Sequence, residues 1–229
     1  MPPKSRAENR AEQTRAIQVT GRRHLAEVGP AALSLRAIAR EVGLVSSAVY
    51  RYFPSRDDLL TALIIEAYDE LGDAVETADA GVRDRDDLAG RFIAVGNAIR
   101  DWARANPHEY ALLYGSPVPG YAAPDTTIPS AARISGAFLT LAQLSGQRGD
   151  AVPQARPVSA QERQALGGIR QALDVPLDDE RTVRWLIAWS TVFGHLSLEL
   201  FGHMYRGILD YDAHFAQVTG QLTADLGLA

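Results

Sequence analysis

The chain contains no cysteine, which excludes disulfide bonds, thiolate metal sites and a cysteine nucleophile. It also has no run of 18 uncharged apolar residues, so we expect no membrane-spanning helix and no membrane partner. The first residues, MPPKSRAENRAEQTR, lack the apolar segment of a secretory signal. These absences predict a globular, cytoplasmic protein, and 229 residues suffice for one large core or two modest ones.

Strand-like alternation, internal repeats and heptad arrays are also missing. The chain has no HExxH motif, no glycine-rich phosphate loop and no nucleophile elbow, so we expect neither an enzyme nor a bound cofactor. We predict an all-α fold. It should have an N-terminal three-helix helix-turn-helix domain at residues 1–55 and a larger helical domain at residues 56–229.

Charge is distributed unevenly along the chain. The net charge is −5, which by itself argues against nucleic-acid binding. Residues 1–60, however, hold 10 Lys or Arg against 6 Asp or Glu, whereas the remaining residues hold 13 against 22. A basic N-terminal module on an acidic remainder would concentrate the field that attracts DNA at one end of the chain.

A helix, a tight turn and a second helix are predicted within ALSLRAIAREVGLVSSAVYRYFPSRDDLL. Ser34 is a suitable N-cap, and Gly43 provides the left-handed stop that helix ends favour. We expect a short second helix from Ser46 or Ser47 to about Phe53, before Pro54. Small and polar residues at its start, followed by tyrosines and arginines, are typical of a helix that reads the major groove.

The segment GLVSSAVYRYFPSRDDLLTAL resembles the recognition helix and linker of the TetR/AcrR family of transcriptional regulators. The resemblance covers about residues 10–70. Tyr52 stands where His is commoner, Arg56 where Lys is commoner and Ala48 where Gly or Thr is usual, which leaves the base preference open. The resemblance implies that Tyr50 and Arg56 hold phosphates.

Further DNA contacts are expected around these two residues. The resemblance implies that Arg36, Ser46, Ser47 and Arg51 lie near base edges. The full set of predicted DNA-binding residues is Ser34, Arg36, Ser46, Ser47, Ala48, Tyr50, Arg51, Tyr52 and Arg56.

The remaining helices follow from apolar periodicity. Residues 1–10 should form a polar, mobile tail, and a first helix should span about Ala11 to Val28. A helix of about 22 residues from Ser55 would be long enough, at roughly 33 Å, to link the two domains. Beyond it we expect helices at about 88–106, 108–114, 128–144, 159–173, 178–201 and 210–226, with a connection at 147–157.

Two segments, ANPHEYALLYG and WSTVFGHLSLELFGHM, resemble the C-terminal domain that some TetR regulators carry, named for its Trp-His-Gly features. The resemblance implies a domain that binds a small effector and forms a homodimer through its last two long helices. It implies a repressor that occupies a palindromic operator in double-stranded DNA until a hydrophobic effector releases it. The predicted effector-binding residues are Trp102, Tyr110, Tyr114, Phe138, Trp189, Phe193 and His195.

Two other functions remain open from the residues alone. His195, Glu199 and His203 recur every four residues, a spacing that a metal site can use, so a helical metal-dependent or hydrolytic enzyme is the alternative. Core or interface polar residues are the commoner explanation, and we predict no metal site. A helical interaction module without a DNA role would require that Tyr50 and Arg51 have no binding function.

Overall fold

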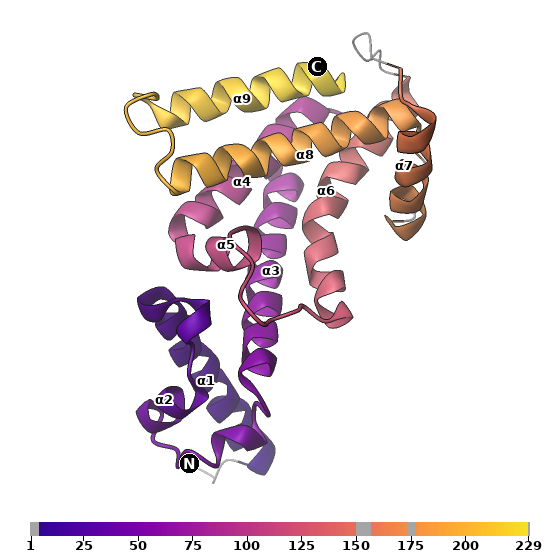
Figure 1. Cartoon of the computed structure of the whole chain (residues 1–229). Coiled ribbons are helices and arrows are strands. Elements are labelled where there is room, and N and C mark those ends of the chain that lie inside the picture. Colours follow the sequence, from indigo (N-terminus) through magenta and orange to yellow (C-terminus); the bar gives the residue numbers. More distant parts are fainter. Residues whose placement is uncertain (1–4, 150–156, 174–176, 229) are drawn as a thin grey trace. The chain divides into compact units, whose positions relative to one another are not determined.

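The computed structural model describes residues 5–149, 157–173 and 177–228. These residues form nine α-helices and three short 3-10 turns, with no strand among them, which confirms the all-α prediction (Figure 1). The helices are α1 (Arg6–Val28), α2 (Leu35–Glu41), α3 (Arg56–Gly81), α4 (Leu88–Ala105), α5 (Pro107–Tyr114), α6 (Ile128–Arg148), α7 (Ala160–Leu173), α8 (Asp179–Leu200) and α9 (Tyr211–Leu226). Within the described ranges, none of these helices is both long and apolar enough to cross a membrane.

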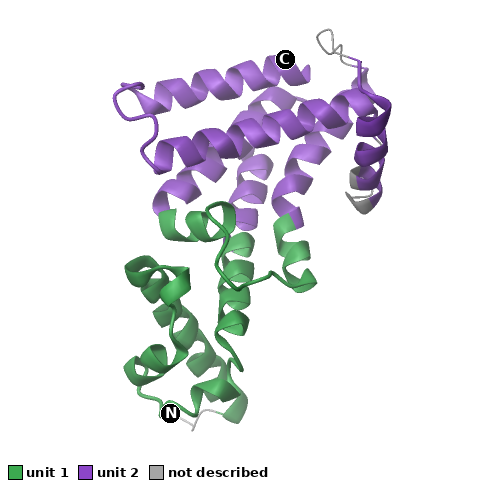
Figure 2. Ribbon diagram, in the orientation of Figure 1, with its two compact units in different colours: residues 1–69, 106–131 green, residues 70–105, 132–229 purple. Residues whose placement is uncertain are grey.

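The chain divides into two compact units (Figure 2). Unit 1 comprises Met1–Asp69 and Asn106–Ala131, and unit 2 comprises Glu70–Ala105 and Ala132–Ala229. Helices α3 and α6 therefore contribute residues to both units. The predicted functional boundary near residue 55 remains a proposal, because compactness also assigns the start of α3, all of α5 and the segment after it to unit 1.

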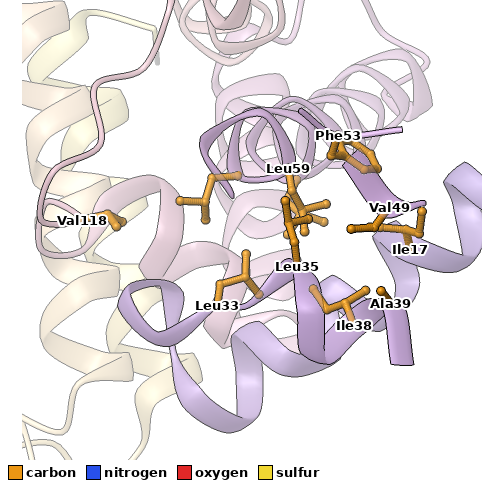
Figure 3. Packing of buried hydrophobic residues seen from close by; sticks show 11 residues of the cluster. Ile17, Leu33, Leu35, Ile38, Ala39, Val49, Phe53, Leu59 and Val118 are labelled. Carbon is orange, nitrogen blue, oxygen red and sulfur yellow. The ribbon is translucent and has the colours of Figure 1, made fainter. Parts of the chain in front are cut away.

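Unit 1 is built on a small apolar core (Figure 3). Ile17 from α1, Ile38 from α2 and Leu59 from α3 are fully buried and meet there. The spacing of Val45, Val49 and Phe53 predicts one inward stripe; Val49 and Phe53 do close the core, but the prediction is wrong for Val45, which is 72% exposed. Helix–turn–helix geometry thus follows from burying one apolar stripe on each short element.

Helix α1 begins earlier than the sequence led us to expect. The Ser5 hydroxyl accepts a hydrogen bond from the Glu8 amide, and the Glu8 carboxylate accepts one from the Ser5 amide. This reciprocal capping box satisfies two otherwise unpaired amide groups and starts the helix at Arg6. The predicted mobile tail is therefore wrong for residues 6–10, and residues 1–4 lie outside the described residues.

The segment predicted as the recognition helix is also shorter than expected. Residues 46–48 form a turn, and only the 3-10 turn η2 (Val49–Arg51) is helical. Pro54 lacks an amide proton and disfavours helical geometry in the residue before it, so it ends the segment at Phe53. The prediction of a regular helix from Ser46 or Ser47 to about Phe53 is therefore wrong.

Helices α4, α8 and α9 form the centre of unit 2 and pack against one another. Phe92, Val192 and Phe215 are among their buried side chains. The Asp210 carboxylate caps α9 by accepting from the amides of Asp212 and Ala213. The predicted helices of this region are present, and the connection predicted at 147–157 begins later because α6 runs to Arg148. Residues 150–156 of that connection lie outside the described residues.

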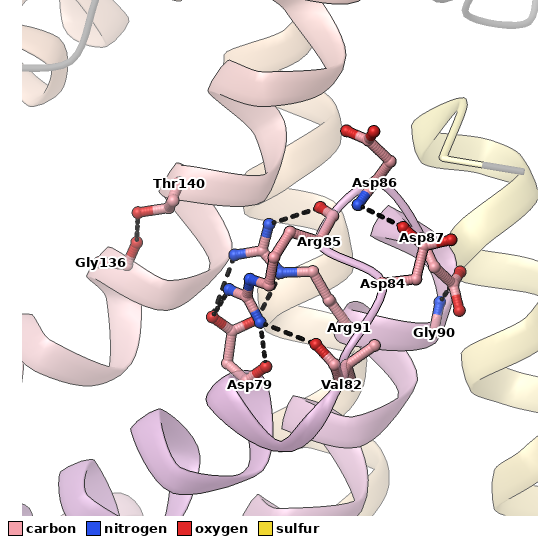
Figure 4. Close-up of polar contacts among 10 residues, drawn as sticks. All are labelled: Asp79, Val82, Asp84, Arg85, Asp86, Asp87, Gly90, Arg91, Gly136 and Thr140. Carbon is pink, nitrogen blue, oxygen red and sulfur yellow. Dashed lines mark hydrogen bonds and ion pairs between the residues drawn. The ribbon is translucent and has the colours of Figure 1, made fainter.

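An arginine pair fastens the connection between α3 and α4 (Figure 4). The Asp79 carboxylate accepts hydrogen bonds from Arg91 Nε at 2.7 Å and from Arg85 Nη2 at 2.6 Å. Burial alone would raise the pKa of Asp79, but the hydrogen bonds from both arginines outweigh it and hold that pKa below its ordinary value. Arg91 is almost fully buried, so this cluster is part of the unit's interior.

Candidate DNA-binding surface

The residues predicted to approach base edges lie on the outside of unit 1. Ser46, Ser47 and Arg51 are exposed on the segment after the turn, and Arg36 is exposed on α2. Tyr50 is also exposed, with 41% of its surface accessible. These polar side chains point outward because Val49 and Phe53 of the same segment are buried in the core.

Three predicted residues are hydrogen-bonded within unit 1 or partly buried in it. The Ser34 hydroxyl caps α2 by accepting from the Ala37 amide, at 3.4 Å. Tyr52 is half-buried. Arg56 donates from Nη2 to the Pro30 carbonyl at 2.6 Å and pairs with Asp57 at 3.4 Å. Its guanidinium therefore ties the start of α3 to the turn between α1 and α2, and a phosphate contact by Arg56 remains a prediction.

Arg10 contacts residues 46–53, the recognition segment, and this contact was not predicted from the sequence. Its Nη2 atom donates to the Arg51 carbonyl at 2.9 Å, and its guanidinium carbon lies 5.3 Å from the centre of the Tyr52 ring. The signal that could have revealed this was the Ser5-x-x-Glu8 capping box, which places Arg10 inside a helix.

Several charged side chains of α1 form ion pairs with neighbouring helices. Arg22 Nε lies 3.3 Å from Glu109 Oε1 on α5, and only 10% of the Glu109 side chain is exposed. Arg23 and His24 both contact Glu41 at the end of α2. These pairs brace α1 against its neighbours, although the Arg23 side chain stays 51% exposed.

A second group of arginines in unit 1 is exposed and makes no ion pair in the described part of the chain. Its members form no ion pair with a carboxylate anywhere in residues 5–149, 157–173 and 177–228. These exposed arginines are Arg6, Arg10, Arg15, Arg36, Arg40 and Arg51. Unpaired guanidinium groups are suited to phosphate oxygens, which match their planar array of donors.

Two of the predicted effector residues belong to unit 1, on α5. Tyr110 is fully buried, and its ring lies 5.3 Å from that of Tyr114. Tyr114 also meets Tyr68 of α3 edge to face, with ring centres 6.2 Å apart. Burial raises the pKa of Tyr114 well above its ordinary value, so its hydroxyl stays protonated.

The other five predicted effector residues belong to unit 2 and lie in separate contacts. Trp189 and Phe193 pack together, with ring centres 5.0 Å apart on α8. Phe138 packs edge to face on Phe92, and Trp102 is 8% exposed on α4. His195 lies against His214 of α9, with ring centres 5.0 Å apart. The structure therefore brings Trp189 to Phe193, but it does not place all five around one cavity.

Phe138 also borders a small apolar cavity that the sequence analysis did not identify. Its volume is about 10 Å³, which leaves room for little more than one water molecule. An effector of modest size would have to widen it. The lining residues are Phe92, Phe138, Leu141, Ala142, Arg181, Arg184, Trp185, Leu226 and Leu228.

The spaced polar residues of α8 do not form a metal site among the described residues. The Glu199 carboxylate accepts from Arg100 Nε and Nη2, at 2.9 and 2.8 Å, so it is held by an ion pair. His203 is exposed in the turn after α8. The three side chains singled out by their spacing thus have three different surroundings.

Comparison with known proteins identifies both parts of the chain. Residues 17–63 match the bacterial regulatory proteins of the tetR family, and residues 92–222 match the tetracyclin repressor-like C-terminal domain. The chain is 46% identical over 192 residues to the HTH-type transcriptional regulator Rv1816 of Mycobacterium tuberculosis, covering 80% of this chain and 78% of the relative. A Mycobacterium bovis regulator, Mb1846, matches equally well.

Solved structures agree with this assignment. The crystal structure of the protein SCO4313 is 32% identical, with a TM-score of 0.76 over 96% of this chain and 98% of that one. The TetR family transcriptional regulator PfmR from Thermus thermophilus is only 15% identical, and its TM-score of 0.54 over 92% of this chain and 96% of PfmR supports the fold alone. From the helix-turn-helix core, the C-terminal helices and these relatives it follows that the chain belongs to the TetR family of transcriptional regulators.

Proposed function

We propose that the protein is a repressor that binds a palindromic operator in the cytoplasm as a homodimer and is released by a small hydrophobic effector. The observation that carries the DNA-binding part is the set of exposed arginines in unit 1 that have no carboxylate partner among the described residues, apart from Arg10, whose guanidinium already bonds to the Arg51 carbonyl. Cations that have no carboxylate partner in the described structure lose no ion pair when they meet a phosphate.

The roles within this surface follow the family resemblance and the observed exposure. Tyr50 and Arg56 hold the DNA backbone, so they affect all sequences alike. Arg36, Ser46, Ser47 and Arg51 face the base edges, so they affect sequence preference. Arg51 is the strongest candidate, because its side chain is exposed while its backbone is anchored by Arg10.

A selection experiment tests the DNA-binding proposal. The wild-type protein is mixed with a library of random duplexes about two DNA turns long, and bound DNA is recovered, amplified and sequenced. Enrichment of a two-fold symmetric site supports the proposal, and recovery of no preferred sequence contradicts it. Arg83→Ala, which removes an exposed arginine from unit 2, is the matched control and should select the same site with the same affinity.

The dimer proposal rests on α8 and α9. Ile187 and Leu198 of α8 remain 57% and 46% exposed, although the opposite face of the helix is buried. Pairing this face across a two-fold axis would bury them and place two recognition segments about one DNA turn, roughly 34–36 Å, apart or a little further. Analytical ultracentrifugation at micromolar concentration should show a dimer that Leu198→Asp weakens, and a stable wild-type monomer would contradict the proposal.

The effector proposal concerns the aromatic residues of unit 2, chiefly Trp102, Trp189 and Phe193, with His195 as a polar neighbour. Aromatic side chains with few polar neighbours suit a hydrophobic or aromatic ligand. Tyr110 and Tyr114 stay predicted effector residues, to be tested separately on α5. An effector that prefers the DNA-free state a hundredfold would supply about 2.7 kcal/mol of coupling, enough to empty a weakly held operator.

A two-stage screen tests this part. Small apolar compounds that raise the unfolding temperature of the wild-type protein are retested for release of the selected operator. Trp189→Ala and Phe193→Ala should weaken release while operator binding without ligand is retained. An unchanged ligand response in variants of Trp102, Trp189 and Phe193 alike would place the effector site elsewhere.

A further inference from the structure

In the recognition segment the amides of Ala48, Arg51, Tyr52 and Phe53 donate to backbone carbonyls, and none of these bonds reaches the carbonyl of Tyr50 or Arg51. The amides of Tyr52 and Phe53 both donate to the Val49 carbonyl, at 2.9 and 3.0 Å. Pro54 has no amide proton, so it cannot extend this pattern to the next carbonyl. The last carbonyl groups of a helical turn therefore depend on donors from elsewhere.

Arg10 provides such a donor from a different helix. Its Nη2 atom donates to the backbone carbonyl oxygen of Arg51 at 2.9 Å. Arg51 is also the residue whose side chain is expected to contact bases. The same guanidinium stacks over the ring of Tyr52, with 5.3 Å between the guanidinium carbon and the ring centre. A planar guanidinium can make both contacts at once, because its donors lie in the plane and its face is available for stacking.

Helix α1 holds Arg10 in a defined place. The capping box between Ser5 and Glu8 fixes the first turn, so Arg10 lies in an ordered helix rather than in a tail. Further along, Ile17 and Leu25 are buried and anchor the helix to the core of unit 1. The contact therefore joins the recognition segment to a rigid element.

We propose that Arg10 is a positioning residue for sequence reading, which fixes the recognition segment at Arg51 and Tyr52 so that the Arg51 side chain meets bases in one orientation. The inference rests on the proposed DNA-binding function. It differs from a phosphate contact by Arg10, because a positioning residue changes the discrimination between sequences, whereas a phosphate contact changes the affinity for all of them.

The first experiment needs no DNA. Hydrogen–deuterium exchange of the amides at residues 48–53 is measured in the wild type, in Arg10→Ala and in Arg6→Ala. Arg6 is exposed one turn earlier on the same helix, so its variant removes the same charge. Exchange in this segment should become several-fold faster in Arg10→Ala only, while residues 59–67 of α3 stay unchanged. Equal exchange in all three proteins, or faster exchange in α3 as well, overturns the proposal.

The second experiment uses the operator selected by the wild type and a shuffled duplex of the same length. Arg10→Ala should lower the ratio of operator to shuffled affinity about tenfold, and the slope of log affinity against log salt should match that of the wild type. A slope shallower by about one marks a phosphate contact and overturns the positioning role, as does an unchanged affinity ratio. If the wild type selects no operator, the DNA-binding proposal fails, and the exchange experiment still decides whether Arg10 orders the segment.

Discussion

The two units differ in how most of their arginines are used. In unit 1 the exposed arginines of α1, α2 and the recognition segment defined above have no carboxylate partner among the described residues. In unit 2 arginines from four helices and the α3–α4 connection meet carboxylates, and two of them are almost fully buried. The paired arginines of unit 2 are Arg85, Arg91, Arg100, Arg104, Arg133, Arg148, Arg170, Arg181 and Arg184.

The difference has a physical cause. A buried guanidinium loses its hydration and must be paired with good geometry, so Arg91 and Arg100 each have a carboxylate within hydrogen-bond distance. An exposed guanidinium keeps its water and can stay unpaired until an anion arrives. Net charge therefore misleads for this chain, since much of the negative charge in unit 2 is already matched to its own arginines.

The largest effect should come from breaking the buried pair in unit 2. Glu199→Ala leaves the guanidinium of Arg100, whose side chain is 6% exposed, without its bidentate partner. We expect the free energy of unfolding to fall by about 3–5 kcal/mol in urea denaturation, as for other broken buried pairs. Asp212→Ala removes the other partner of Arg100, which is 75% exposed, and should cost no more than about 1 kcal/mol. Equal losses in the two variants would contradict the contrast.

Removing an exposed arginine from unit 1 should change DNA recognition rather than stability. Arg51→Ala should alter which operator sequence is preferred, because each base contact contributes roughly 1–3 kcal/mol of discrimination. Its unfolding temperature should match that of the wild type, since the side chain is exposed. Competition binding with single-base operator variants measures the change. Weakening at every sequence alike would show that Arg51 holds phosphate instead.

Backbone contacts should produce a smaller and uniform loss. Tyr50→Phe and Arg56→Ala should weaken binding to all duplexes alike, and Arg56→Ala should make the salt dependence shallower by about one. Arg56 also donates to the Pro30 carbonyl, so its variant should lose about 1 kcal/mol of stability as well. Salt titrations of operator and shuffled DNA, with denaturation as a parallel measurement, separate the two roles. A normal salt slope in Arg56→Ala would assign Arg56 to structure alone.

The smallest expected effect is a pH dependence at His195. Burial lowers the pKa of His195, and the neighbouring His214 and Arg100 lower it further, against the opposite influence of Glu199. The folded state then binds fewer protons than the unfolded chain. Stability should therefore fall as the pH drops below the ordinary histidine value of 6.5, by at most about 1.4 kcal/mol per pH unit.

Two variants isolate this contribution. His195→Leu should lose that slope as the pH falls from 6.5 to about 5, whereas His203→Leu, altered at an exposed position, should keep it. Urea denaturation of both variants at several pH values provides the measurement. An unchanged slope in His195→Leu would show that other groups carry the pH dependence.

Much of the architecture could be predicted because it rests on local signals. Ser34 marks the start of α2, and the spacing of Val49 and Phe53 predicts their burial beside the turn, although Val45 of the same spacing is exposed. The errors came from competing local rules. The Ser5–Glu8 capping box extended α1 beyond the residues with apolar periodicity, and the segment after Gly43 forms a turn and the 3-10 turn η2 before Pro54 ends it.

The sequence by itself determined the fold class, the family and the outward-facing positions of the recognition segment, because periodicity, caps and the motif are all read over a few neighbouring residues. Only the tertiary structure decided which arginines are bound to another residue of the chain. Arg10 reaches Arg51 across 41 positions of the chain, and Arg100 reaches Glu199 across 99. The residue type is arginine in both places, and the role of its guanidinium depends on whether folding brings it a carboxylate, a carbonyl or only water.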